Sequence, residues 1–209
     1  MRTGRPRSFC VDDALDRAMT VFWTKGYEGA SVADLTRAMG INAPSLYACF
    51  GSKEGLFRSV LERYDRRRES FMETVLSAPD AQAVAETFLF GMVAFAADTN
   101  GRTPPGCLLV QSGQSCGDAD IPGMVARHRA EKEAALRTRF EQAKKAGDLP
   151  RGASPAALAR YLMAMANGIC MQAAAGATPK ELNEVAALAL AGWPGKTAGR
   201  AAKTVREPA

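Results

Sequence analysis

The chain has 209 residues, of which 47% are hydrophobic, so it can bury a sizeable core and most of it is not disordered. Its 27 Lys and Arg residues against 22 Asp and Glu residues give a modest net charge of +5. The excess gathers at residues 1–8 and 195–209, and a basic end of this kind either binds a polyanion or is a solvated tail.

The five cysteines are odd in number and no pair has C-x-x-C spacing, so neither a disulfide scaffold nor a zinc site is expected. No apolar segment follows the basic first eight residues, and no run of 18 apolar residues occurs. We therefore expect no secretory signal and no membrane span, and a reducing cytoplasm is the expected compartment.

The spacing of apolar residues predicts helices along the chain, and no segment shows the alternation of a strand. The first helix begins near Val11 and is expected to end at Gly26. Two short helices follow between residues 31 and 47. Further helices are expected at about 53–76, 81–98, 107–114, 123–146, 154–174 and 179–192, so the fold class is all-α.

The two short helices are joined by a turn of the length that a helix-turn-helix requires. Ser31 and Asn42 are suitable N-cap residues for the first and the second helix, and Pro44 is tolerated in a first turn. Gly40 can take the positive φ of a sharp turn. The second helix would then present its N-terminal residues to the major groove of DNA.

This region resembles the DNA-binding domain of TetR-family repressors over residues 10 to about 65. The matching segments, in residue type and spacing, are 26–35, 38–41, 45–47 and 50–56. The rest of the chain resembles the family in architecture, with a similar segment at 106–110. The resemblance implies a three-helix DNA-binding domain with a basic arm (1–53), a helical ligand-binding and dimerisation domain (54–194) and a basic disordered tail (195–209).

The resemblance also implies which residues contact double-stranded DNA. Ser31, Tyr47 and Lys53 would bind backbone phosphates, while the start of the recognition helix would reach base edges. The full expected set is Arg5, Arg7, Ser31, Asn42, Ala43, Pro44, Ser45, Tyr47 and Lys53. Plainer interpretations stay open, with Ser31 and Asn42 as caps only, Tyr47 as core and Lys53 as a solvated first-turn residue.

The sequence departs from the family pattern at Ala48 and Cys49, where members commonly place His or Tyr before the Phe. The phosphate contact that this His or Tyr would make is therefore not expected in this chain. The recognition helix also lacks Arg, so bidentate guanine contacts are not expected from it, and preference would rest more on apolar contacts and DNA shape.

The resemblance to the family also implies an effector pocket among the C-terminal helices. The expected lining is apolar and Met-rich, and plain core is the more ordinary interpretation of each member: Phe88, Met92, Phe95, Cys107, Val110, Met163, Asn167 and Met171. Because this set contains no charged residue, we expect a small, neutral and apolar effector.

Cys107 suggests an alternative, a repressor that senses oxidants or electrophiles through its thiol. It follows Pro105 and Gly106, which could place it near a helix N-terminus, where the pKa of a thiol falls. Buried packing is the plainer interpretation of Cys107. Cys116 could pair with Cys107 under oxidation, and Cys49 could carry redox control of the DNA-reading unit.

His128 is the only histidine, and on a polar helix it is expected to be a solvated surface residue. No nucleophile, base and acid can be grouped around it, so no catalytic, metal or cofactor site is expected. Two competing hypotheses are a helical enzyme or carrier, which the helix-turn-helix disfavours, and an architectural DNA binder, which an apolar cavity within 88–171 would disfavour.

A single helix-turn-helix buries too little surface for tight specific binding, so a homodimer on a palindromic site is expected. The alanine-rich helices within 154–192 would form the interface. Its candidate residues are Leu158, Tyr161, Leu162, Met165, Ile169, Val185, Leu188 and Leu190.

Overall fold

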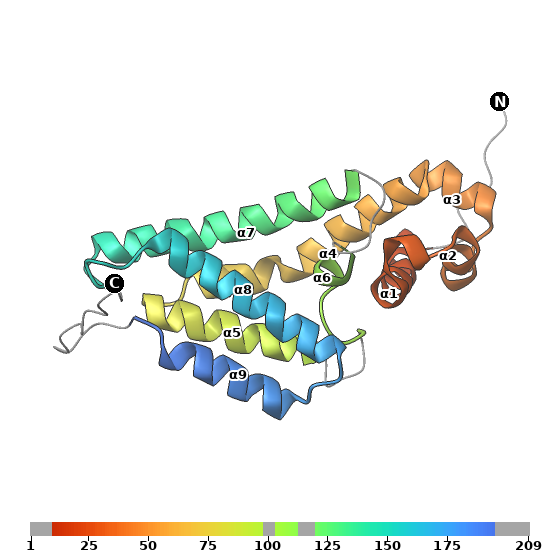
Figure 1. Ribbon diagram of the computed structural model, residues 1–209. Coiled ribbons are helices and arrows are strands. Elements are labelled where there is room, and N and C mark those ends of the chain that lie inside the picture. Colours follow the sequence, from red (N-terminus) through yellow and green to blue (C-terminus); the bar gives the residue numbers. More distant parts are fainter. Residues whose placement is uncertain (1–9, 98–102, 113–119, 195–209) are drawn as a thin grey trace, which may run out of the picture.

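The computed structural model describes residues 10–97, 103–112 and 120–194. These residues form helices and no strand, which confirms the all-α prediction (Figure 1). No helix among them is long and apolar enough to cross a membrane. The helices are α1 (Val11–Gly29), α2 (Val32–Met39), α3 (Ala43–Phe50), α4 (Lys53–Leu76), α5 (Ala81–Ala97), α6 (Leu108–Ser112), α7 (Asp120–Lys145), α8 (Pro155–Ala174) and α9 (Pro179–Ala191).

The N-terminal end of the molecule is a small bundle of α1, α2, α3 and the beginning of α4. Its core comes from the predicted apolar stripe of α1, which includes Phe22 and Trp23, and from Leu35 and Leu46 of the two short helices. The backbone leaves helical geometry at Gly26, as expected (φ 69°, ψ 173°), but one further helical turn follows and extends α1 to Gly29. That turn resumes because Tyr27 is buried and its ring stacks on Phe22.

The long helix α4 joins this end to the rest of the molecule (Figure 1). It begins at Lys53, where Ser52 accepts a hydrogen bond from the Gly55 backbone N–H at 2.9 Å. Gly55 is required there, because a Cβ would lie 2.1 Å from the carbonyl oxygen of Phe50. At 24 residues α4 is about 36 Å long, so its first turns pack under α1 and its later turns enter the C-terminal bundle.

Ion pairs tie α4 to α1 across the junction of the two parts. The Arg63 guanidinium contacts the Asp12 carboxylate at 2.8 Å and donates from Nη2 to Asp16 Oδ2 at 2.9 Å. These contacts raise the pKa of Arg63 above its ordinary value, chiefly through the hydrogen bond to Asp16. A rotation of α4 would therefore carry α1 with it.

The C-terminal part is a bundle in which the apolar helix α5 packs against α4, α8 and α9, and α7 lies along α8. The predicted helices appear with small shifts of their ends, since the helix expected at 123–146 begins at Asp120. Of the helix expected at 107–114, the described residues show α6, which begins at Leu108, and residues 113 and 114 lie outside the described residues. The expected domain division at 53/54 coincides with the start of α4, whose contacts belong to both parts. The basic arm 1–9 and the basic tail 195–209 lie outside the described residues.

Candidate DNA-reading and effector sites

The turn between α2 and α3 has the geometry that the sequence predicted. Gly40 adopts a left-handed conformation with φ 69° and ψ 31°, which ends α2. The backbone N–H of Ile41 donates to the carbonyl of Thr36 at 3.1 Å, which closes the turn. Asn42 then caps α3 by accepting from the Ser45 backbone N–H at 2.8 Å.

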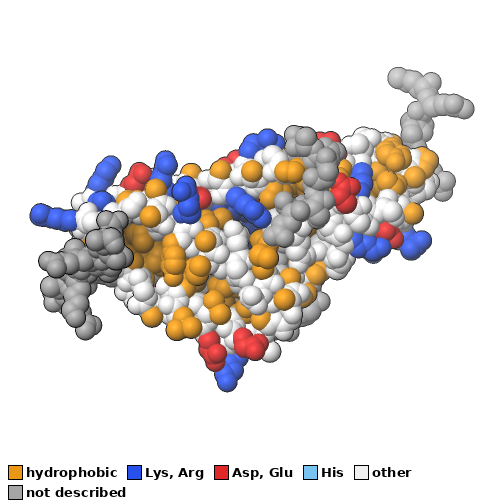
Figure 2. All heavy atoms as spheres, viewed as in Figure 1, with side chains coloured by type: hydrophobic (Ala, Val, Ile, Leu, Met, Phe, Trp, Pro, Cys, Tyr) orange, Lys and Arg blue, Asp and Glu red, His pale blue; other side chains and the backbone are white. Residues whose placement is uncertain are grey.

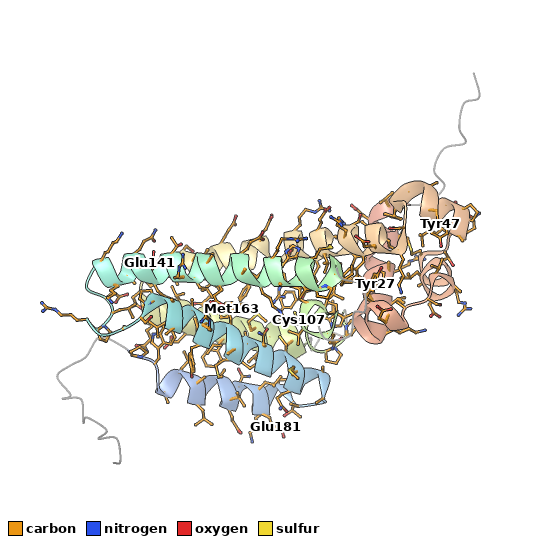
Figure 3. The ribbon with its side chains drawn as sticks, turned by 45° about the horizontal axis from the view of Figure 1, so that its top comes forward. Tyr27, Tyr47, Cys107, Glu141, Met163 and Glu181 are labelled. Carbon is orange, nitrogen blue, oxygen red and sulfur yellow. The ribbon has the colours of Figure 1, made fainter. Side chains whose placement is uncertain are left out.

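Helix α3 is anchored on one side and open on the other. Leu46 is completely buried and holds the helix against the core, while Asn42, Pro44 and Tyr47 are exposed. Tyr47 is 48% exposed and lies at the end of the molecule farthest from the C-terminal bundle (Figure 3). A large aromatic side chain that leaves the core is not explained by packing, so the interpretation of Tyr47 as core is wrong.

The other expected DNA contacts fall into two groups. Ala43 and Ser45 are half-buried at the start of α3, beside the exposed residues of that helix. Cys49 is half-buried on the same helix, and Ala48 is exposed. Arg5 and Arg7 lie outside the described residues, so the expected contacts of the arm stay predictions.

Ser31 forms a complete capping box with Asp34. Its hydroxyl accepts from the Asp34 backbone N–H at 3.1 Å and donates to Asp34 Oδ2 at 2.7 Å, so its proton is already engaged. Lys25 contacts the same carboxylate at 2.9 Å. The hydrogen bonds from Lys25 and Ser31 lower the pKa of Asp34 to about 2. Sequence reasoning missed Lys25, because its partner lies on another helix.

Lys53 is the first residue of α4 and is partly buried. Its ammonium lies 4.4 Å from the centroid of the Tyr27 ring, which fixes the direction of its long side chain. The Lys53 ammonium therefore lies over the Tyr27 ring in the first turn of α4, and its phosphate contact stays a prediction beside the plainer interpretation as a solvated first-turn residue.

A cavity of about 40 Å³ lies inside the C-terminal bundle, enclosed by α4, α5, α6, α7 and α8. Six of the eight expected lining residues surround it: Phe88, Met92, Cys107, Val110, Met163 and Asn167. In Figure 3, Met163 marks its side on α8, and Cys107 lies at the end of the bundle nearer to α1.

Two expected lining residues are not part of the cavity wall. Phe95 instead covers the Arg68 guanidinium, whose central carbon lies 4.2 Å from the centroid of the ring. Met171 is 50% exposed and lines an outer groove between α8 and α9. The helical period alone could not separate the inner face of α8 from its outer face, because apolar residues occupy both.

The expectation that no charged residue lies inside the cavity is wrong. Arg68, Arg129 and Lys132 line it, and Arg68 is only 6% exposed.

The expectation for His128 is also corrected, because its Nδ1 contacts the carboxylate of Asp65 and its side chain is only 25% exposed. Asp65 also pairs with Lys132 at 2.8 Å, so α4 and α7 are joined by this group.

Cys107 is 5% exposed and receives several polar contacts. Arg68 donates to the hydroxyl of Tyr64 at 2.7 Å, and that hydroxyl lies 3.1 Å from Cys107 Sγ. The hydrogen bond from Cys170, with Arg68 and Tyr64, lowers the pKa of the Cys107 thiol, while burial raises the pKa of Tyr64. Cys116, the other expected thiol partner, lies outside the described residues.

The wall of the cavity meets the DNA-reading end in two places. Helix α6, which supplies Leu109 and Val110 to the lining, packs against α1, and an aromatic pair joins α4 to α1. The ring of Tyr64 on α4 meets Trp23 of α1 edge to face, with centroids 5.4 Å apart. The same tyrosine hydroxyl faces Arg68 and Cys107 at the cavity wall. A change in the cavity can therefore reach α1 through Tyr64 as well as through α6.

The outer face of α8 and α9 carries apolar side chains that the fold does not cover. Leu188 is 75% exposed, and Val185 and Met171 are also exposed. Of the expected interface residues, Leu162 and Ile169 are buried within the chain itself and are core. Figure 2 shows apolar side chains gathered over the lower helices, whereas Lys and Arg side chains project along the opposite edge.

Among the described residues, no three His, Cys, Asp or Glu side chains are grouped so that they could hold a metal ion. The arrangement thus offers a protruding helix-turn-helix, an internal cavity and an uncovered apolar face.

Comparisons with known proteins agree with this geometry. The family model described as bacterial regulatory proteins, tetR family, matches residues 14–60. The HTH-type transcriptional repressor ComR of Escherichia coli is 35% identical over 196 residues, covering 91% of this chain and 92% of that protein. The repressor BdcR of the same organism is 52% identical over 61 residues, 29% of this chain and 31% of BdcR.

A solved structure extends the likeness to the whole molecule. A cysteine mutant of the TetR family transcriptional regulator CifR, in complex with 26-base-pair operator DNA, has 38% sequence identity and a TM-score of 0.84. The match covers 91% of this chain and 100% of that chain. It confirms the predicted architecture of an N-terminal helix-turn-helix domain followed by a C-terminal helical domain.

Proposed function

The chain belongs to the TetR family of bacterial transcriptional regulators, and from this premise we propose that it is a homodimeric repressor released from a palindromic operator by a small molecule. The observation that carries the proposal is the helix-turn-helix, whose recognition helix leaves Asn42, Pro44 and Tyr47 exposed at one end of the molecule. The likeness to a DNA-bound regulator supports it. Work on operator DNA would place the protein in the cytoplasm.

Four groups have distinct roles in binding DNA under this proposal. Asn42 and Ser45 at the start of α3 meet base edges, and Ala43 or Pro44 meets a thymine methyl. Tyr47 and Lys53 bind phosphates on either side of the groove and fix the register. Ser31 acts first as the cap of α2, because its hydroxyl proton is held by Asp34. Arg5 and Arg7 extend the interface along the backbone or into the minor groove.

The uncovered face of α8 and α9 supports the dimer. An exposed leucine beside exposed valine and methionine is costly in water, and a second copy of the chain would cover all three. Dimerisation also places two recognition helices at the spacing of successive major grooves. The cavity enclosed by α4–α8 is the effector site, since it is an internal space that reaches α1 through Tyr64 and Trp23.

Thiol sensing at Cys107 is a less favoured second candidate. The contacts of Arg68 and Tyr64 with Cys107 favour it, but the thiol is nearly inaccessible to an oxidant in solution. The transcriptional-regulator relatives leave the hypothesis of a helical enzyme or carrier without support. The cavity likewise disfavours a purely architectural DNA binder.

The proposal is tested by selecting binding sites from random duplex DNA with the full chain and with the Leu188→Glu variant. The wild type should enrich a two-fold symmetric sequence and sediment as a dimer. Leu188→Glu places a charge on the apolar face, so it should sediment as a monomer and lose most of its operator affinity. Phe90→Glu, the same change at an exposed apolar residue of α5, is the control and should leave both properties intact. A wild type that enriches no sequence would contradict the proposal.

A further inference from the structure

Positive charge inside the effector cavity has no acidic partner among the residues that line it. Arg68, Arg129 and Lys132 all line the cavity, and no described Asp or Glu does so. Lys132 has a counter-charge in Asp65, which does not line the cavity and whose Oδ1 lies 2.8 Å from the Lys132 ammonium. Arg68 and Arg129 form no salt bridge within the described part of the chain.

Arg68 directs its donors at weak acceptors. Its Nη1 donates to the Tyr64 hydroxyl at 2.7 Å and lies 3.6 Å from Cys107 Sγ, while Nη2 lies 3.0 Å from the thioether sulfur of Met92. A thioether is a poor partner for a guanidinium, which is matched by the two oxygens of a carboxylate. A buried guanidinium directed at sulfur is therefore under-satisfied.

Arg129 supplies a second unfilled donor at the same cavity. Its Nη2 donates to the carbonyl of Leu109 at 3.1 Å, which fixes the side chain over α6. Its Nε is buried and has no hydrogen-bond partner among the described residues. Leaving a buried charged donor without an acceptor is costly, so such an atom requires a physical explanation, and a bound anion would supply one.

A negative charge on Cys107 would not supply a counter-charge to both arginines. Even as a thiolate Cys107 carries one negative charge, which faces Arg68 through Nη1 and Tyr64. Arg129 would still have no counter-charge among the residues that the structure describes. The cavity therefore keeps an excess of positive charge in an apolar setting of Phe71, Phe88 and Met163.

We propose that the effector is a small organic anion whose carboxylate binds Arg129 and Arg68, with its apolar remainder against Phe71, Phe88 and Met163. The free volume of about 40 Å³ accepts about three water-sized groups, which is enough for the carboxylate alone. The apolar remainder therefore requires the flexible methionine side chains of the lining to move aside. The inference rests on the proposed function for its biological meaning, and it replaces the neutral effector expected from the sequence.

The test compares acids with amides of nearly the same shape, so that charge is the main difference. Butyrate and butyramide, and benzoate and benzamide, are titrated calorimetrically into the full chain without DNA, and each pair is repeated by thermal shift. The two carboxylates should bind and raise the Tm, and the amides should bind at least about tenfold more weakly. Equal affinity within both pairs, or no binding by either carboxylate, would overturn the proposal.

Variants assign the effect to the cavity. Arg129→Gln should weaken carboxylate binding by about tenfold or more and leave amide binding unchanged, because it removes the charge but keeps a polar side chain. Arg127→Gln, at an exposed arginine two residues away on α7, is the matched control and should bind like the wild type. Arg68→Gln should weaken carboxylate binding in the same way as Arg129→Gln. If Arg68→Gln does not fold, the affinities measured with Arg129→Gln alone test the proposal. Carboxylate binding by Arg129→Gln at wild-type affinity refutes the assignment.

Binding without DNA keeps the two proposals separate. A chain that binds butyrate or benzoate but selects no operator contradicts the proposed repressor and leaves the anion site standing. A chain that selects an operator but discriminates no acid from its amide contradicts the anion site alone.

Discussion

At the scale of single residues, Tyr47 and Lys53 contribute to DNA binding by different physical means. Tyr47 offers a neutral hydroxyl from an exposed position, whereas Lys53 offers a charge held over the Tyr27 ring. A charge that neutralises a phosphate releases a counterion, and a neutral hydrogen bond does not. The two side chains should therefore differ in how they change the salt dependence of binding.

We predict that Tyr47→Phe weakens binding to specific and non-specific duplexes alike by about tenfold, through loss of a hydrogen bond to a charged phosphate. The slope of log K against log salt should not change. Lys53→Gln should make that slope shallower by about 0.9 for each phosphate that is no longer neutralised. Fluorescence anisotropy titrations across a salt series measure both quantities. Unchanged affinity of Tyr47→Phe would contradict its phosphate-binding role, and an unchanged slope for Lys53→Gln would contradict the role of the lysine.

At the scale of the helical element, the capping box of α2 links the stability of the DNA-reading unit to pH. The Asp34 carboxylate accepts from Ser31 and pairs with Lys25, and these contacts lower its pKa from 3.8 to about 2. A carboxylate whose pKa is lower in the folded state stabilises that state above its unfolded pKa. This stabilisation is complete above pH 3.8 and is lost as the pH falls through 2.

We predict that Asp34→Asn lowers the urea midpoint of unfolding at neutral pH, because the variant loses the ionic part of the cap and the pair with Lys25. The difference from wild type should narrow as the pH falls below 3.8, since the wild-type carboxylate is then increasingly protonated. Urea unfolding followed by circular dichroism across this range measures it. Glu62→Gln, at an exposed acid of α4, controls for the change in net charge. A difference in urea midpoint between Asp34→Asn and the wild type that stays constant down to pH 2 would contradict the role given to Asp34.

The helix-turn-helix was predictable at this scale because its signals are local. The caps at Ser31 and Asn42 and the positive φ of Gly40 act within four residues, so their geometry follows from neighbouring sequence. The cavity charge was not predictable in this way. Arg68 stands in a run of three arginines that is typical of a solvated face, and only the packing of α4 in the C-terminal bundle buries it.

The sequence also could not show which face of α8 turns inward, and this explains why Met171 was expected in the cavity lining. Met163 and Met171 lie on one helix with similar neighbours, yet the first lines the cavity and the second lines the outer groove. Which face of α8 turns inward depends on the positions of α5, α7 and α9. The sequence could therefore predict that α8 is apolar and rich in small residues, but not which of its methionines a ligand would contact.

At the scale of the whole molecule, a ligand in the bundle must change the position of α3, which it does not touch. One described connection runs from the cavity wall through the Tyr64 hydroxyl to its ring, and from the ring to Trp23 on α1. Arg63 couples the same two helices by its ion pairs with Asp12 and Asp16. Because packed helices shift as rigid bodies, a small displacement of α4 would move the recognition helix.

We predict that Tyr64→Phe uncouples the two sites while leaving both of them intact. In the wild type, saturating benzoate should weaken operator binding by about 5- to 150-fold, the usual range for coupled sites. In Tyr64→Phe this factor should fall toward one, because the ring still packs on Trp23 but no hydroxyl connects it to Arg68 and Cys107. Operator affinity without benzoate should stay within about threefold of the wild type, since Tyr64 is not among the residues that meet DNA.

The control for this uncoupling is Tyr161→Phe. Its hydroxyl donates to the carbonyl of Ala189 at 2.8 Å, so the substitution removes one hydrogen bond within the C-terminal bundle and none on the path to α1. Tyr161→Phe should lose about 1 kcal/mol of stability and Tyr64→Phe about 1.5–3 kcal/mol, because the Tyr64 hydroxyl accepts from the charged Arg68. Only Tyr64→Phe should lose the response to benzoate. Anisotropy titrations of the operator with and without benzoate give the coupling factor for each protein. Equal coupling in the wild type and Tyr64→Phe would show that the signal reaches α1 by another route, of which the Arg63 ion pairs are the next to be tested.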